Sequence, residues 1–396
     1  MRPSSTRTPT DPRMAVTVAC VALFTDMLVY GILIPVLPLL PAVTEAGPTA
    51  TGLLFAAYAA ALVIITPIAG RAVDRRGPRG PLLVALVGLA CACVLFVVGS
   101  PYWLLLTARA LQGAAAGLSW VAGLSLIAAT VPLQRRGTYL GLAMSMVSVG
   151  VLAGPPLAGW LARLGGHAAP LLFAAALLLI DGVLRIAFIR PIPSPEDDPA
   201  TAMDVLRTPG CRPVAALILI GAAVTSCIEP ILPMQLADVL GVGPTGIGLL
   251  FALLTLVSAC LNPVVGACLA HVAPRTLACS GVASAAAGLL LVGVGSDLPV
   301  LIAGLICLGA AIALLVAPAS TLISLQGAMA TPPAIGGAYS LYNLAYASGL
   351  ILGPTLSGTF TEQVGFTRAC SAMAAALVLT VPIFIRLPRD LAVTPE

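Results

Sequence analysis

The chain has 396 residues, of which 59% are hydrophobic and only 9% are charged, with a formal net charge of +4. Soluble domains average about 45–50% apolar and about 25% charged residues, so this composition, with a mean hydropathy of +1.07, excludes an ordinary soluble protein. All 19 basic residues are arginine, which excludes P-loop ATPases and Schiff-base enzymes because both need a lysine. The scattered cysteines and the distant His167 and His271 indicate no metal site.

Apolar stretches long enough to cross a bilayer, about 20 residues each, follow one another along the chain. Six lie at 15–40, 50–71, 80–99, 102–131, 138–162 and 169–189, and six more at 213–237, 246–270, 275–295, 298–323, 336–360 and 366–386. The polar, proline-rich segment 190–212 separates them as a cytoplasmic linker. We therefore predict an all-α membrane protein of 12 transmembrane helices in two six-helix bundles, 15–189 and 213–386, with short tails at 1–14 and 387–396.

The two predicted bundles are related by an internal repeat. Residues 47–55 resemble residues 243–251, and the glycines at 150, 154 and 159 recur at 349, 353 and 358 with nearly the same offset. An even number of spans per repeat gives halves that are parallel and related by an axis along the membrane normal.

Arginine placement predicts the orientation, because cytoplasmic loops of membrane proteins carry an excess of basic residues. With the N-terminus in the cytoplasm, the outer loops hold only Arg163 and Arg368. The inner loops and tails then hold most others, including Arg75, Arg76, Arg79, Arg135, Arg136, Arg190, Arg207, Arg212 and Arg275. We expect a multi-pass plasma-membrane protein with both termini in the cytoplasm.

Four motifs resemble those of one large transporter family. Residues 70–79 resemble the signature loop of the major facilitator superfamily, and residues 109–113 resemble its Arg-x-x-Gln-Gly motif. Residues 150–159 resemble the glycine–proline motif of proton-driven exporters, and residues 26–38 the first helix of twelve-helix drug:proton antiporters. The segments 181–182, 229–233 and 339–358 resemble vesicular amine transporters, although Asn343 stands where those transporters carry an acidic residue.

This resemblance implies a function and its partners. It implies the major facilitator fold and proton-coupled efflux of a small amphipathic, cationic organic compound or drug, as in multidrug resistance. The partners would be the solute, protons and the lipid bilayer, with no nucleic acid and no cofactor besides the proton gradient, and the chain would act as a monomer. The alternatives are proton-linked uptake of a nutrient or metabolite and a sensor or assembly protein that transports nothing. We expect no enzymatic activity.

Charged residues within the predicted spans are candidates for function, since each costs about 2.5–3.5 kcal/mol to insert. Asp26 in the first span could bind a proton or a cation, or serve as a hydrogen-bonded strut. Glu229 in the seventh span stands directly before Pro230, which should open the helix locally because proline lacks an amide donor. Glu229 could likewise bind a proton or cation, or be structural.

Two more sets of residues carry charge inside the spans. The resemblance ties Arg109 in the fourth span to proton coupling, and the alternative is a fixed ion pair with the first span. Asp181 and Arg185 are four residues apart and share one helical face, which favours a local ion pair. By resemblance, Asn343 in the eleventh span completes the set of proton- or substrate-binding candidates.

Glycines and loop charges suggest structural devices. Gly70, Asp74, Arg75, Arg76 and Arg79 form a predicted conformational latch, in which Asp74 meets the positive N-terminal end of the eleventh span; these arginines could also only set topology. In the fifth span, a predicted motif for close helix packing is formed by Gly150, Gly154, Pro155 and Gly159.

Overall fold

The computed structural model describes residues 12–99, 101–131, 133–166, 168–188, 202–269, 271–295, 297–330, 335–385 and 387. In chain order, the first-half elements are α1 (Pro12–Val36), the 3-10 turn η1 (Leu37–Leu39), α2 (Pro41–Arg76), α3 (Arg79–Val98), α4 (Tyr102–Thr130), α5 (Leu133–Gly165) and α6 (Ala168–Phe188). The later elements are α7 (Ala202–Leu206), α8 (Cys211–Ser226), α9 (Leu232–Asp238), α10 (Pro244–Cys268), α11 (Pro274–Val294), α12 (Leu298–Met329), α13 (Ile335–Val364), α14 (Phe366–Val378) and α15 (Val381–Phe384).

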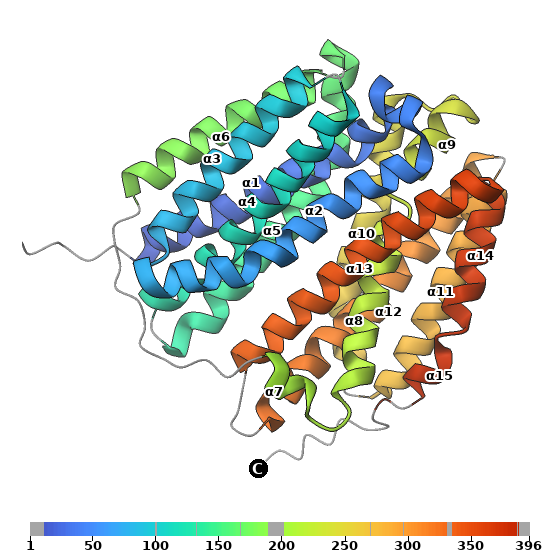
Figure 1. The fold of residues 1–396 in the computed structure, drawn as a ribbon. Coiled ribbons are helices and arrows are strands. Elements are labelled where there is room, and N and C mark those ends of the chain that lie inside the picture. The colour runs from blue at the N-terminus through green and yellow to red at the C-terminus, as the bar shows by residue number, and fades with distance from the viewer. Residues whose placement is uncertain are drawn as a thin grey trace, which may run out of the picture.

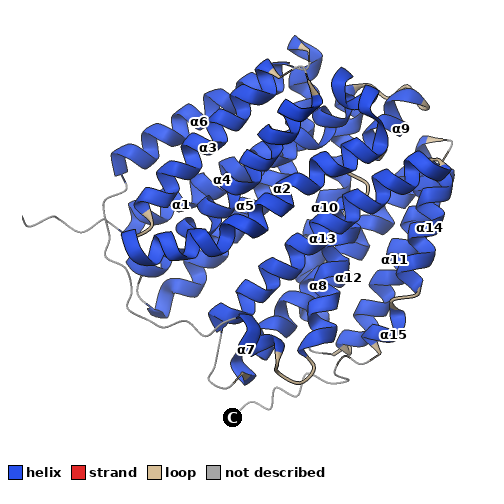
Figure 2. Ribbon diagram, viewed as in Figure 1, coloured by secondary structure: helices blue, strands red, loops and turns tan. Residues whose placement is uncertain are grey.

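The helices form two bundles side by side, α1–α6 and α8–α15 (Figure 1), and every regular element among the described residues is helical (Figure 2). In the described ranges, 10 helices are long and apolar enough to cross a membrane. The shorter α8 and the more polar α13 account for the other two predicted spans. The all-α architecture in two bundles is therefore confirmed. The predicted linker lies mostly outside the described residues, but α7 falls within it and packs against α13.

Prolines interrupt two of the predicted spans. The seventh is divided into α8, which ends at Ser226, and α9, which begins at Leu232. Pro230 has no amide hydrogen for the carbonyl of Ser226, so the helix opens where the sequence predicts. The predicted twelfth span is one segment of membrane length, Phe366–Phe384, and a turn within it separates α14 from α15. Its cause is Pro382, which cannot donate to the carbonyl of Val378.

Glycines allow helices to touch backbone to backbone within each bundle. A Cβ on Gly154 of α5 would lie 2.6 Å from the Cα of Gly31 in α1. The equivalent glycine of the repeat, Gly353 in α13, would place a Cβ 2.6 Å from the carbonyl oxygen of Ala223 in α8. The α1–α5 and α8–α13 pairs are thus the same contact made twice, and the predicted packing role of Gly154 is confirmed.

The same two helices, α5 and α13, also join the bundles to each other. A Cβ on Gly358 of α13 would lie 2.3 Å from the carbonyl oxygen of Pro48 in α2, and a Cβ on Gly159 of α5 would lie 2.4 Å from that of Pro244 in α10. Both contacts involve the C-terminal part of one helix and the N-terminal part of the other. The two inter-bundle seams are therefore related by the repeat and close the same end of the molecule.

The polar contacts of the two seams differ, since Thr245 of α10 donates to the carbonyl oxygen of Gly159 in α5, whereas the α2–α13 seam has a carboxylate contact. Near the end of α13, beyond the predicted span 336–360, Glu362 accepts a hydrogen bond from the backbone amide of Thr49 at 3.0 Å. Thr49 follows a kink at Gly47, whose φ of 87° is in the left-handed region that glycine tolerates. A carboxylate at the start of the continuing helix also meets its positive dipole end. At the offset of the repeat, the position of Glu362 corresponds to Arg163, so only the α2–α13 seam has this contact.

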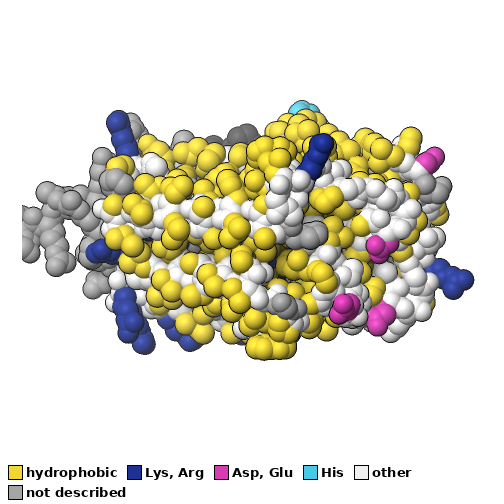
Figure 3. All heavy atoms as spheres, turned by 90° about the horizontal axis from the view of Figure 1, so that it is seen from above, with side chains coloured by type: hydrophobic (Ala, Val, Ile, Leu, Met, Phe, Trp, Pro, Cys, Tyr) yellow, Lys and Arg dark blue, Asp and Glu magenta, His cyan; other side chains and the backbone are white. Residues whose placement is uncertain are grey.

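Charges on the surface separate along the molecule. On the face shown in Figure 3, most of the visible arginines gather toward one end, the visible acidic side chains lie toward the other, and hydrophobic side chains cover the area between them. Large exposed apolar side chains such as Ile64, Leu179 and Leu379 fit a surface that faces lipid rather than water.

The contact between α5 and α1 can be tested by adding one methyl group. Gly154→Ala should lower the free energy of unfolding by about 1–3 kcal/mol, because backbone atoms cannot move aside as side chains do. Gly80→Ala is the matched control, since a Cβ at Gly80 meets nothing within 4 Å. Unfolding of both purified variants in detergent, followed by circular dichroism, measures the difference. Equal stability of the two variants would contradict the close contact.

The contact between Glu362 and Thr49 should depend on pH. Hydrogen bonding by the Thr49 side chain and amide holds the pKa of the Glu362 carboxyl below its usual range. A carboxyl with a lowered pKa contributes above its unfolded value, about 4.3, and its contribution disappears as the pH falls through the folded value. The contact should therefore persist at neutral pH.

Amide hydrogen exchange measures this contact directly. At neutral pH, Glu362→Ala should accelerate exchange in the segment 48–51, because the amide of Thr49 loses its acceptor. The exposed Glu45 provides the control, and Glu45→Ala should leave exchange in this segment unchanged. Unaltered exchange in Glu362→Ala would show that this hydrogen bond does not hold the seam.

Candidate transport site

The buried charged side chains of the described residues are Asp26, Arg109, Asp181, Arg185 and Glu229. Lipid-covered helices offer no water to these groups, so each must find its partners inside the protein. The five residues form two separate groups, one around Arg185 and one around Arg109.

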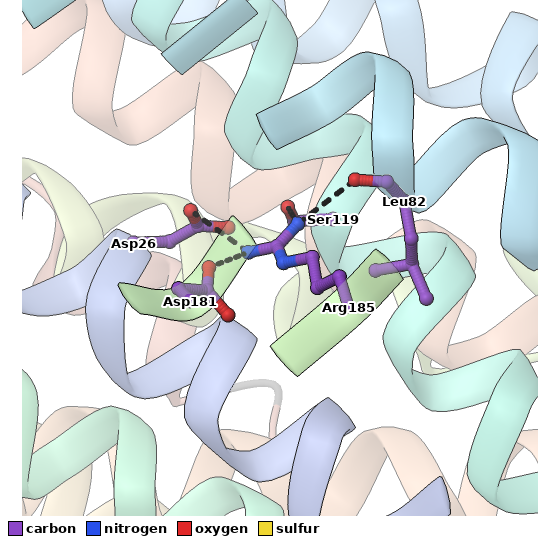
Figure 4. A network of polar contacts seen from close by, with 5 residues as sticks. All are labelled: Asp26, Leu82, Ser119, Asp181 and Arg185. Atoms are coloured by element: carbon purple, nitrogen blue, oxygen red, sulfur yellow. Dashed lines mark hydrogen bonds and ion pairs between the residues drawn. The ribbon is translucent and has the colours of Figure 1, made fainter. Parts of the chain in front are cut away.

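Arg185 of α6 is the centre of the first group, which Figure 4 shows. Its Nη2 donates to Oδ2 of Asp181 at 2.5 Å and lies 3.9 Å from Oδ1 of Asp26 in α1. Its Nη1 donates to the carbonyl oxygen of Leu82 in α3 at 3.0 Å and to Oγ of Ser119 in α4 at 3.2 Å. The predicted local ion pair with Asp181 is therefore present, and the same guanidinium also connects four helices.

Asp26 is the under-satisfied member of this group. Its side chain is buried, and neither carboxylate oxygen has a hydrogen-bond partner in the described structure. Oδ1 of Asp181 also has none. Two carboxylates therefore share one guanidinium, which leaves an excess of one negative charge when both are ionised. The structural alternative for Asp26, a strut, would depend on its 3.9 Å ion pair with Arg185 and on the nearby hydroxyl of Ser119.

Glu229 lies at the break between α8 and α9 and forms a contact across the two bundles. The hydroxyl of Tyr30 in α1 donates to Oε2 of Glu229 at 2.8 Å. The side chain is buried, with 5% of its surface exposed. The opened helix thus presents a carboxylate toward the opposite bundle, at the interface between the two halves.

Arg109 of α4 lies among three aromatic rings. Its guanidinium carbon is 5.0 Å from the ring centroid of Tyr30, 4.8 Å from that of Phe55 and 4.9 Å from that of Tyr58. These distances are within the range of cation–π attraction. Its Nη1 donates to Oε1 of Gln112 at 2.7 Å. Within the described residues no carboxylate forms an ion pair with Arg109, so the alternative of a fixed ion pair with the first span is not what the structure has.

The two groups are neighbours along α1. Asp26 and Tyr30 are four residues apart and lie on the same face, about 6 Å apart along the helix axis. Asp26 contacts the group around Arg185, whereas Tyr30 contacts both Arg109 and Glu229. The two groups are therefore connected by a single turn of one helix.

Other predicted residues lie apart from these groups. Asn343 is half-buried on α13, and its side chain forms no hydrogen bond with Asp26 or Glu229. Of the predicted latch, the side chain of Asp74 lies outside the described residues, while Arg75 and Arg76 are exposed at the end of α2. The described part of the chain contains no cluster of three or more His, Cys, Asp or Glu residues that could hold a metal ion.

The aromatic members of the site were not among the residues that the sequence singled out. Tyr30, Phe55 and Tyr58 look like ordinary apolar-span residues in the sequence, because Tyr and Phe are common there. One signal was available: the spacing of Tyr30 from Asp26 puts both on one helical face. The positions of Phe55 and Tyr58 relative to Arg109 required the packing of α2 against α4.

The hydrogen bond between Tyr30 and Glu229 can be tested without any substrate. Tyr30→Phe keeps the ring beside Arg109 but removes the donor to a buried carboxylate, so the free energy of unfolding should fall by about 1.5–3 kcal/mol. Tyr339→Phe is the control, since that tyrosine is exposed on α13. Chemical unfolding of the purified proteins would measure both. If Tyr30→Phe is as stable as Tyr339→Phe, the hydrogen bond to Glu229 does not stabilise the protein and the assignment is contradicted.

The chain is similar in sequence to known membrane transporters. The sequence profile of the Major Facilitator Superfamily matches residues 19–221 and again 214–395. The human synaptic vesicular amine transporter is 27% identical over 343 residues, covering 85% of this chain and 66% of that protein. The vesicular acetylcholine transporter of Drosophila melanogaster is 24% identical, covering 95% of this chain and 71% of that protein.

A solved structure shares the fold. The crystal structure of the human organic anion transporter MFSD10 (TETRAN) superposes with a TM-score of 0.65 at 18% identity, covering 94% of this chain and 99% of that one. The predicted resemblance to vesicular amine transporters is confirmed as distant similarity. The chain spans only about two thirds of the length of the amine transporters, 66% in the human case.

Proposed function

The chain belongs to the Major Facilitator Superfamily and is a multi-pass membrane transporter, and on that basis we propose that it exchanges protons for a small organic cation by alternating access. The direction we propose is export from the cytoplasm. One observation supports this proposal above the others: a buried carboxylate, Glu229, is held at a helix break and hydrogen-bonded to Tyr30 of the opposite bundle.

A cationic substrate suits the chemistry around Glu229. A buried carboxylate attracts an organic ammonium by charge, and the Tyr30 hydroxyl that now donates to Glu229 could give way to it. The rings of Tyr30 and Tyr58 have centroids 5.0 Å apart, and Leu350 and Ile351 of α13 pack against the same cluster. Two of the relatives are named for amine and acetylcholine transport, which are compounds of this class.

Alternating access would act on the contact between Tyr30 and Glu229. The two bundles meet through the seams α2–α13 and α5–α10 at one end. When the bundles rock about the site, this inter-bundle hydrogen bond must break or form again. A substrate cation bound to Glu229 replaces the hydroxyl of Tyr30 as its partner, so substrate binding and bundle movement would be linked through one carboxylate.

Asp26 is the proposed proton-binding residue. Its oxygens have no hydrogen-bond partner, and its group holds one more carboxylate than guanidinium. Adding one proton removes that excess charge. Because Asp26 and Tyr30 share one face of α1, proton binding would alter the position of the residue that contacts Glu229.

The arginine distribution supports a location in the cytoplasmic membrane with both termini in the cytoplasm. Both halves of the site are contributed by one chain, so we propose that the monomer is the working unit. The end of the molecule at which the two seams meet, near Thr49 and Glu362, would then face the outside of the cell. Export of foreign or endogenous compounds, including drugs, is the physiological role we propose, and its support is the resemblance of residues 150–159 to the motif of proton-driven exporters.

Transport in proteoliposomes tests the function, with ethidium as an organic-cation probe. When the compartment on the side of the outer loops is acidic, the protein should drive ethidium toward that compartment. Asp26→Asn should abolish the effect of the pH gradient but leave exchange of labelled for unlabelled ethidium, whereas Glu229→Gln should abolish both. The reason is that Asp26 binds the proton and Glu229 binds the cation.

Asp238→Asn provides the matched control, because Asp238 is an exposed carboxylate at the end of α9. Its transport should equal that of the unaltered protein. Unchanged gradient-driven transport in Asp26→Asn would remove Asp26 from the mechanism. Movement of the probe in the direction of proton flow would instead support the alternative, proton-linked uptake.

A further inference from the structure

The charges in the group around Arg185 also indicate how Asp26 differs from Asp181 as a proton acceptor. All three of its charged members are buried, with 0% of the Arg185 side chain and 2% of the Asp26 side chain exposed. The group around Arg109 is balanced, since it joins one arginine to one carboxylate through Tyr30. The group around Arg185 is unbalanced, with two carboxylates and one arginine. An uncompensated charge is costly in such a place, so this group needs one additional positive charge.

Arg185 lies closer to the carboxylate of Asp181 than to that of Asp26. It donates to Asp181 at 2.5 Å, and two further hydrogen bonds, to the carbonyl oxygen of Leu82 and to Ser119, hold the guanidinium toward α3 and α4. Asp26 is 3.9 Å from the same nitrogen and makes no hydrogen bond. The geometry therefore separates a carboxylate that is neutralised by its partner from one that is not.

Among the residues that the structure describes, no charged group other than Arg185 compensates Asp26. α1 packs against α4, α5, α6 and α10. α6 presents Asp181 and Arg185, and α4 presents Ser119. The more distant Cys93 of α3 and Tyr58 of α2 are the other titratable groups that interact with Asp26. α10 contains no charged residue, and α5 places Gly150 against residues 24–28.

We propose that Arg185 is a positioning residue which, by remaining on Asp181, leaves Asp26 as the single proton acceptor of a site that is separate from the cation site at Glu229. The step is the addition of one proton to a carboxylate oxygen of Asp26, which changes the charge of the group from one negative to none. No other bond is formed or broken. This inference rests on the proposed function for its role in transport, but the protonation itself can be measured without transport.

Infrared difference spectroscopy of the full-length protein in lipid measures the protonation, because a protonated carboxyl has a carbonyl stretch that a carboxylate lacks. Acidification should produce one such signal from Asp26, which Asp26→Asn removes. Glu229→Gln is the comparison, since it should leave the Asp26 signal in place.

Asp181→Asn is the decisive variant. With Asp181 neutral, Arg185 turns to Asp26 as its only counter-charge. The midpoint of the Asp26 signal should then move to more acidic pH by about one to three units, the effect of an opposite charge at close range. Arg185→Lys, which keeps the charge, should retain a single-proton signal, whereas Arg185→Gln should add a second one. Loss of the Asp181 charge alone also moves this midpoint to more acidic pH, so Asp181→Asn is compared with the double variant Asp181→Asn/Arg185→Gln, in which the acid shift should be lost because Arg185 is absent.

Two results would overturn the proposal. If Asp181→Asn removes the signal while Asp26→Asn leaves it, Asp181 is the acceptor. If the midpoint is unmoved in Asp181→Asn, Arg185 does not position the proton. Failure of the proposed function is distinguishable, because a protein that moves no ethidium but shows the predicted titration loses only the transport assignment. Normal ethidium transport with an unmoved midpoint would reject the role of Arg185 alone.

Discussion

The absence of water around the transmembrane helices is the constraint on which the rest of this structure depends. A charge inside a bilayer costs several kcal/mol unless the protein supplies its partners. Arg185 meets most of this requirement with hydrogen bonds to acceptors on α3, α4 and α6, although its Nε has no partner. Arg109 lies among aromatic faces and donates to one amide oxygen, while its Nε and Nη2 have no hydrogen-bond partner. Neither carboxylate oxygen of Asp26 has a hydrogen-bond partner, and this deficit is the basis of its proposed protonation.

The scaffold that positions these groups is built from glycine contacts repeated in both halves. Gly154 and Gly353 bring α5 against α1 and α13 against α8, while Gly159 and Gly358 bring the same helices against the opposite bundle. Helices in lipid gain no hydrophobic driving force from one another, so close backbone packing becomes the main attraction between them. The bundles are thereby stiff units with two narrow seams, which suits movement of one unit against the other.

The charged residues do not follow the symmetry of this scaffold. The group around Arg185 belongs to the first half alone, and the helix break that carries Glu229 belongs to the second. Only one seam is closed by a carboxylate, Glu362, at the position that corresponds to Arg163. The repeat therefore supplies a mechanical framework, while the departures from it supply the chemistry. Tyr30 connects the charged residues of the two halves, since it contacts both Arg109 of the first half and Glu229 of the second.

The sequence by itself determined the membrane class, the two bundles, the helix break before Pro230 and the pairing of Asp181 with Arg185. Each of these depends on local properties: apolar length, the missing amide of proline, and the spacing of residues on one helix. Only the tertiary structure decided that Asp26 shares Arg185 with Asp181, that Arg109 lies among aromatic rings, and that Tyr30 bonds to Glu229. Those contacts join α1 to α6, α4 to α2, and one bundle to the other. Their partners are far apart in the chain, so no spacing rule predicts them, and packing alone brings them together.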